Sequence, residues 1–127
     1  MEKKVFLSYA NNDAVYADLL IRSLKRKGIT AFNFQESLTS DANWDETLRK
    51  ELEESSAFIP LISDNWRQSN NAALEYGAAF AMGKKIIPVV IDSTTNDDVA
   101  IDLNRYSLVD AKNEDLETVA QQVEVTI

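Results

Sequence analysis

Apolar residues fall into short runs along the chain, and these runs alternate with stretches in which apolar positions recur every three or four residues. The short runs have the length of strands, and they cover residues 5–9, 29–34, 57–62, 86–91 and 105–109. The stretches of helical spacing cover residues 16–24, residues 44–52, the segment around Glu75 and residues 116–123. The strand runs lack polar alternation, which is typical of strands covered on both faces. This order predicts a flavodoxin-like, doubly wound α/β fold with a parallel five-stranded sheet and helices on both faces, in a single domain over residues 1–127.

Residues that break regular structure refine these predictions. We expect Asn12 to cap the first helix and Gly28 to end it. Pro60 and Pro88 fall inside the third and fourth strand runs, and proline is disfavoured in a central strand. We therefore expect the strand ladders to be interrupted at both prolines.

Glu75 stands out because no other residue between positions 72 and 83 is charged. The neighbours one helical turn away include Ala72, Ala78 and Ala79, so we expect open space above a carboxylate that is at least partly exposed. The alternative is a solvated glutamate on an ordinary amphipathic helix. In a doubly wound sheet, ligands bind at the carboxyl ends of the strands, where Ser8 and Tyr9 end the first strand and Phe34 ends the second. Glu75 is predicted near that same edge.

The amino-acid composition limits the kinds of metal site and catalysis that the chain could support. The chain has 45% apolar residues and neither cysteine nor histidine, so the usual zinc ligands and the usual general base are missing. We expect no metal site, and catalysis would have to use carboxylates, hydroxyls or lysine. The net charge of −8 argues against a general nucleic-acid surface. There is neither an apolar run near 20 residues nor a secretory signal, so we expect a cytoplasmic protein without a membrane partner.

Several motifs, in this order and spacing, make the chain resemble a TIR (Toll/interleukin-1 receptor) domain of the small bacterial type. They are the opening VFLSYANND, the Gly28–Ile29 step into the second strand, the loop ending in Trp44, the segment FIPLISDNWRQS and the segment LEYGAAFAMGKKIIPVV. The resemblance covers essentially the whole chain.

The resemblance implies two kinds of function. Many TIR domains are non-enzymatic adaptors that associate with one another, whereas others cleave the nicotinamide–ribose bond of NAD+ to give nicotinamide and ADP-ribose or a cyclic product, in bacteria as part of immune defence. In the enzymes the catalytic residue is a glutamate six residues after a serine, and Ser69 and Glu75 match that spacing. We expect NAD+ as substrate and no separate cofactor. The predicted substrate-binding residues are Ser8, Tyr9, Phe34, Ser37, Ser69 and Asn71. The predicted loop for self-association, including head-to-tail filaments, contains Gln35, Glu36, Ser37, Leu38, Thr39, Ser40 and Asp41.

The chain departs from the family pattern at two places. Many relatives have a tryptophan four residues before the glutamate, and here that position is Asn71, which we expect to border the pocket. The loop over residues 35–43 contains two acidic residues and no basic one, so phosphate contacts would come from backbone amides, Ser8, Ser37 or Arg67.

Two other protein classes have a related sheet order or fold. A response-regulator receiver would need an aspartate at the end of the third strand, where this chain has Ser63. A nucleoside deoxyribosyltransferase-like enzyme is a closer alternative, because it also directs a glutamate at an N-glycosidic bond. The adaptor remains the main alternative to the NAD+-cleaving enzyme.

Overall fold

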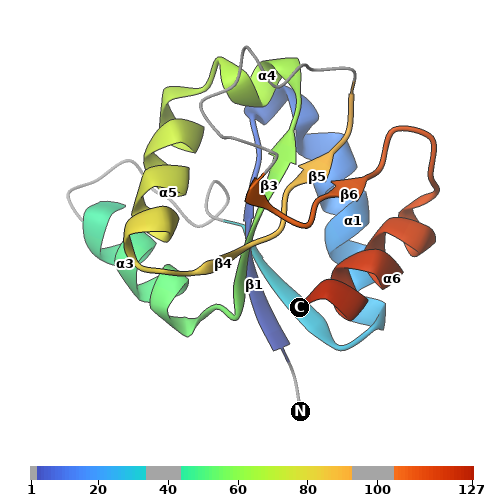
Figure 1. The fold of residues 1–127 in the computed structure, drawn as a ribbon, viewed down its shortest axis with the longest axis horizontal. Helices are drawn as coiled ribbons and strands as arrows, with labels where there is room; N and C mark the ends of the chain where they lie inside the picture. The colour runs from blue at the N-terminus through green and yellow to red at the C-terminus, as the bar shows by residue number, and fades with distance from the viewer. Residues whose placement is uncertain (1–2, 34–43, 93–104) are drawn as a thin grey trace.

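A computed structural model describes residues 3–33, 44–92 and 105–127 of the chain (Figure 1). In this part of the chain a six-stranded parallel sheet has the order β2-β1-β3-β5-β6, and β4 pairs with β3 beside this path. The strands are β1 (Lys3–Ser8), β2 (Ile29–Asn33), β3 (Ala57–Ile62), β4 (Lys85–Ile86), β5 (Val89–Val90) and β6 (Val109–Asp110). The prediction of a doubly wound parallel sheet is confirmed.

Helices cover both faces of the sheet (Figure 1). One face carries α1 (Ala14–Arg26) and α6 (Leu116–Thr126), and the other carries α3 (Trp44–Glu54) and α5 (Asn70–Ala81). The short helix α4 (Asp64–Arg67) joins β3 to α5, and the 3-10 turn η1 (Asn11–Asp13) joins β1 to α1. Two buried clusters result, one on each face, and alternate residues of β1 contribute to them in turn.

The two prolines explain why the fourth apolar run forms two strands. Phe58 pairs with Ile86 and Leu61 pairs with Val89, so Pro60 and Pro88 lie opposite one another in the gap between these pairs. The expected interruption is confirmed on this side of β3. On the other side the ladder is continuous, because Ser8 of β1 pairs with Pro60.

Two boundaries differ from the prediction. Asn12 lies in η1 instead of capping α1, and the residue before that helix, Asp13, makes no side-chain capping bond. The fifth predicted strand begins only at Val109, because the first residues of that run pack on α5 instead. The Arg105 guanidinium lies 5.2 Å from the Phe80 ring centre. The Tyr106 and Tyr76 hydroxyls are 2.8 Å apart. Gly28 follows α1 with φ of +79°, a conformation that glycine adopts without strain, so the predicted helix end is confirmed.

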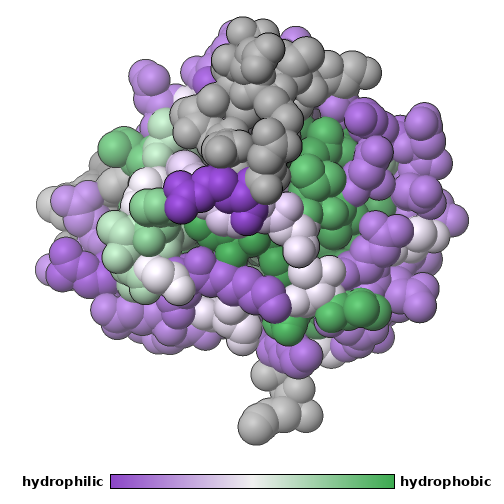
Figure 2. Space-filling view, in the orientation of Figure 1, coloured by the Kyte–Doolittle hydropathy of each residue, from purple (hydrophilic) through white to green (hydrophobic). Residues whose placement is uncertain are grey.

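The outer face of α5 is uncharged. Its single charged residue, Glu75, is buried, whereas Leu74 and Phe80 are 57% and 47% exposed. Small and apolar residues accordingly gather over α5 at the left of Figure 2, beside a more hydrophilic rim. In the described part of the chain, no helix is long and apolar enough to cross a membrane.

Candidate active site

The Glu75 side chain faces the sheet and is only 3% exposed. The expectation of a partly exposed carboxylate is therefore wrong. Ala72 and Ala79, which lie one turn to either side on the same face of α5, are buried as well. Their small side chains bring the helix close to the strands, so the alanines serve close packing and do not leave open space above the carboxylate.

Three buried side chains from three elements, those of Trp66, Ser8 and Glu75, form a chain of hydrogen bonds that ends at the Glu75 carboxylate. The Ser8 Oγ, at the end of β1, donates a hydrogen bond of 2.7 Å to Glu75 Oε1. The Trp66 Nε1, from α4, donates a hydrogen bond of 3.1 Å to the same Ser8 Oγ. Ser8 and Trp66 are each 1% exposed. The predicted meeting of Ser8 and Glu75 at the carboxyl edge of the sheet is thus confirmed, and Trp66 is a partner that the sequence analysis missed.

The surroundings of the carboxylate are apolar. Trp66, Ala72 and Ala79 belong to the buried cluster on this face of the sheet, and the Tyr76 ring meets the Trp66 ring edge-on at 6.5 Å. Burial raises the pKa of Glu75 from its ordinary value of 4.5 to about 7, and the hydrogen bond from Ser8 acts in the opposite direction. At neutral pH the side chain is therefore close to half protonated.

The two oxygens of Glu75 differ in their partners. Oε1 accepts the hydrogen bond from Ser8, and within the described residues Oε2 accepts none. Oε2 is thus the oxygen that is left to contact a ligand. When ionised, it presents a negative charge in an apolar site, where electrostatic attraction to a cation is stronger than in water.

Ser69 has a structural role in the helix that carries Glu75. It is the N-cap of α5, and its Oγ accepts a hydrogen bond of 3.1 Å from the Ala72 N–H. The six-residue spacing therefore places a helix cap about 1.7 turns before the carboxylate. The structure does not bring the Ser69 hydroxyl to Glu75, and its contact with substrate stays a prediction.

The remaining predicted residues have different positions. Asn71 is exposed in the first turn of α5, one turn before Glu75. Tyr9 lies buried among the residues that α1 and α6 cover, on the opposite face of the sheet from Glu75, so the structure does not bring these two residues together. Phe34, Ser37 and the whole predicted loop over residues 35–41 lie outside the described residues.

Polar side chains next to the site tie α4 to η1. Asp13 Oδ2 accepts a hydrogen bond of 2.6 Å from Ser63 Oγ, and Asp13 Oδ1 accepts one of 3.3 Å from Asn65 Nδ2. Arg67, considered above for phosphate contacts, forms an ion pair of 3.0 Å with Asp64. No group of three or more potential metal ligands occurs among the residues that the structure describes.

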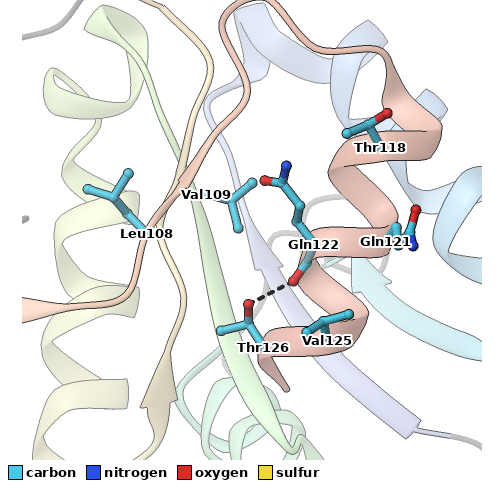
Figure 3. Close-up of a pocket in the computed structure, with 7 residues that line it drawn as sticks. All are labelled: Leu108, Val109, Thr118, Gln121, Gln122, Val125 and Thr126. Atoms are coloured by element: carbon cyan, nitrogen blue, oxygen red, sulfur yellow. Dashed lines mark hydrogen bonds between the residues drawn. The ribbon is translucent and has the colours of Figure 1, made fainter.

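A shallow groove lies at the other side of the molecule, between the edge strand β6 and α6 (Figure 3). Its volume is about 420 Å³. It is lined by Leu108, Val109, Thr118, Gln121, Gln122, Val125 and Thr126. Val125 is 79% exposed there, and the Thr126 hydroxyl donates to the Gln122 carbonyl oxygen at 2.7 Å. The groove does not include any of the residues around Glu75.

Known proteins share this fold over the full length of the domain. The TIR domain of the Toll-related receptor TRR-2 from Hydra magnipapillata matches with a TM-score of 0.76 and 21% identity, over 95% of this chain and 94% of that chain. The TIR domains of the activated Roq1 resistosome match with a TM-score of 0.71 and 19% identity, over 98% of both chains. The CMP N-glycosidase BcmB from Clostridium botulinum matches with a TM-score of 0.62 and 21% identity, over 97% and 99% of the two chains.

Sequence comparison gives the family. A search of curated protein sequences finds no match. A family model described as TIR domain matches residues 5–123, which is nearly the whole chain. The chain therefore belongs to the TIR domain family.

Proposed function

We propose that this TIR domain cleaves the nicotinamide–ribose bond of NAD+, with Glu75 as the catalytic carboxylate. The observation that carries the proposal is the state of Glu75: an isolated, buried carboxylate at the carboxyl edge of the sheet, with Oε1 bonded to Ser8 and Oε2 left without a hydrogen bond in the described structure. A carboxylate placed there solely for stability would be unusual, because burial of an unpaired charge is costly.

The chemistry suits such a group. Nicotinamide is bound to ribose as a cation, so it leaves as a neutral molecule with the bonding electron pair and needs no acid. Positive charge then develops on the ribose, and the ionised Oε2 would stabilise this oxocarbenium-like state in an apolar environment. Water adds to the anomeric carbon and loses a proton to give ADP-ribose, or a nucleophile within the same molecule adds to give a cyclic product.

The raised pKa of Glu75 fits this role. In the free protein the carboxyl is near half protonated at neutral pH. A bound nicotinamide cation favours the charged form of a nearby carboxylate, so substrate binding would lower the pKa and ionise the residue where its charge is needed. The relationship of the fold to that of a CMP N-glycosidase supports N-glycosidic chemistry as a class.

We also infer that the domain acts in assemblies. Its relatives in the Roq1 resistosome belong to a larger complex. The groove between β6 and α6 lies at a sheet edge and exposes Val125, which is the kind of surface that a loop of a second copy could occupy. If the loop over residues 35–41 of one copy docks there, the contact is head-to-tail and leads to filaments, because it does not close on itself. An NAD+-consuming assembly of this kind in the cytoplasm fits a role in bacterial immune defence.

The test is NAD+ consumption by the purified protein, with nicotinamide and ADP-ribose products separated by chromatography. The wild-type chain should release nicotinamide, and Glu75→Gln should lower the rate at least about 100-fold. Glu53→Gln is the matched control, since Glu53 is an exposed glutamate on α3. Absence of nicotinamide release at every protein concentration, in a protein that still self-associates, would instead identify a TIR adaptor.

A further inference from the structure

When Glu75 is ionised, the hydrogen bonds around Ser8 can run in only one direction. The indole N–H of Trp66 is a donor and cannot accept, so Ser8 Oγ must accept at that contact. A hydroxyl has a single proton, and the acceptor that the described structure offers for it is Glu75 Oε1, at 2.7 Å. Trp66 therefore orients the Ser8 hydroxyl so that its proton points at the carboxylate.

The indole itself has a fixed position. The backbone N–H of Trp66 donates a hydrogen bond of 3.0 Å to Ser63 Oγ, the N-cap of α4, and Ser63 in turn donates to Asp13 of η1. The ring is 1% exposed and contacts the Tyr76 ring edge-on. A buried indole, unlike a phenyl ring, requires an acceptor for its N–H, and here Ser8 Oγ is that acceptor.

We propose that Trp66 is a positioning residue for Glu75: acting through Ser8, it ties Oε1 to the end of β1 and keeps Oε2 directed at the reacting ribose. The catalytic part of this inference rests on the proposed NAD+ cleavage. The coupling of Trp66 to Glu75 does not rest on that proposal, because it can be measured in the absence of any substrate.

Few charged groups surround this hydrogen-bond chain. The pKa of Glu75 is raised by burial and lowered by the hydrogen bond from Ser8, and within the described residues no charged side chain adds to this shift. On α4, Asp64 and Arg67 are paired with each other, and on η1 Asp13 is bonded to Ser63 and Asn65. The charged residues of the other segments packed against α5 are Lys3 and Lys4 of β1, Lys85 of β4, Arg105 before β6, and Asp45, Glu46, Arg49, Lys50, Glu51, Glu53 and Glu54 of α3.

The experiment follows the indole N–H resonances of the wild-type protein by NMR between pH 5 and 9. The chain has two tryptophans and no histidine, so two indole peaks are expected and no imidazole titrates in this range. Trp66→Phe and Trp44→Phe each remove one peak and assign the other. We expect the Trp66 N–H to shift with a midpoint near the pKa of Glu75, about 7, and this shift to vanish in Glu75→Gln. A Trp66 resonance that does not change with pH, or that titrates unchanged in Glu75→Gln, overturns the inference.

A second measurement tests the consequence for Glu75. With the Glu75 carboxyl carbon followed by NMR, Ser8→Ala should raise the titration midpoint by about one pH unit and Trp66→Phe by about half as much, because the ionised form loses a hydrogen bond or its orientation. Trp44→Phe should leave the midpoint unchanged. A midpoint in folded Trp66→Phe equal to that of the wild type contradicts the proposal.

A third measurement compares nicotinamide release by Trp66→Phe and by the wild type at pH 8.5, where Glu75 is ionised in the wild type. We expect kcat for nicotinamide release to fall about 10-fold while KM changes little, since an aromatic ring stays at the position and the hydrogen bond that orients Ser8 and the carboxylate is lost. If the wild type shows no NAD+ cleavage, the proposed function fails, and the two titrations still decide whether Trp66 acts on Glu75. If cleavage occurs and kcat in Trp66→Phe equals that of the wild type, the positioning role is refuted.

Discussion

Replacing Glu75 by glutamine should make the protein more stable above neutral pH. Burial raises the pKa of Glu75 from 4.5 to about 7, so between these values the folded state binds more protons than the unfolded state. Stability contributed by the protonated carboxyl is therefore fully present at acid pH and is lost as pH rises through the folded pKa. The rise in pKa corresponds to about 3 kcal/mol once both states are ionised. Glutamine is neutral at every pH, has nearly the same shape, and can still accept the hydrogen bond from Ser8.

Urea unfolding at pH 5 and pH 8.5 measures this difference. We expect Glu75→Gln to be within about 1 kcal/mol of the wild type at pH 5 and more stable by about 2–3 kcal/mol at pH 8.5. The chain has no histidine, which is the side chain whose ordinary pKa lies in this window. Glu53→Gln, at an exposed position on α3, should follow the wild type at both pH values. Parallel pH profiles for the wild type and Glu75→Gln would refute the reasoning, because Glu75 would then not be a buried carboxyl with a raised pKa.

Two further predictions concern the substrate and the assembly. Asn71→Trp should lower the KM for NAD+, because an aromatic ring one turn before Glu75 would add a stacking surface beside the nicotinamide; an unchanged or higher KM would show that Asn71 does not border the pocket. Specific activity should rise steeply with protein concentration, and it should fall when Ser37 and Leu38 are replaced by charged residues or when Val125 in the β6–α6 groove is replaced by aspartate. Constant specific activity over a wide dilution range, unaffected by these variants, would show that the monomer is self-sufficient.

Much of the fold could be predicted from the sequence, because strand-length apolar runs alternating with helical spacing allow few arrangements. The prolines even marked where the sheet divides, since neither Pro60 nor Pro88 can donate a ladder hydrogen bond. The end of the chain was less predictable. Arg105 and Tyr106 have strand-like neighbours in sequence, but their contacts are with α5, and such tertiary contacts leave no mark on local periodicity.

Two residues of the candidate site, Ser8 and Glu75, could be predicted from the sequence, but their environment could not. Glu75 could be identified because it is the one charged residue of its segment, and Ser8 because it lies at the end of a strand. Helix α5 has apolar or small residues on every side, however, so its periodicity could not show that Leu74 faces solvent and Glu75 faces the sheet. The partner of the Trp66 N–H could not be predicted either, because it comes from a strand 58 residues away in sequence.

The central claim is that the ionised Glu75 carboxylate cleaves the nicotinamide–ribose bond. It is tested most directly by kcat/KM for nicotinamide release from NAD+ between pH 5.5 and 9, corrected for release without protein. This quantity reports the ionisation of the free enzyme, so it should rise with pH, level off above a midpoint near 7, and fall at least about 100-fold in Glu75→Gln with the inflection lost. Release by Glu75→Gln at a rate near that of the wild type would contradict the account, as would a wild-type profile with no inflection in this range.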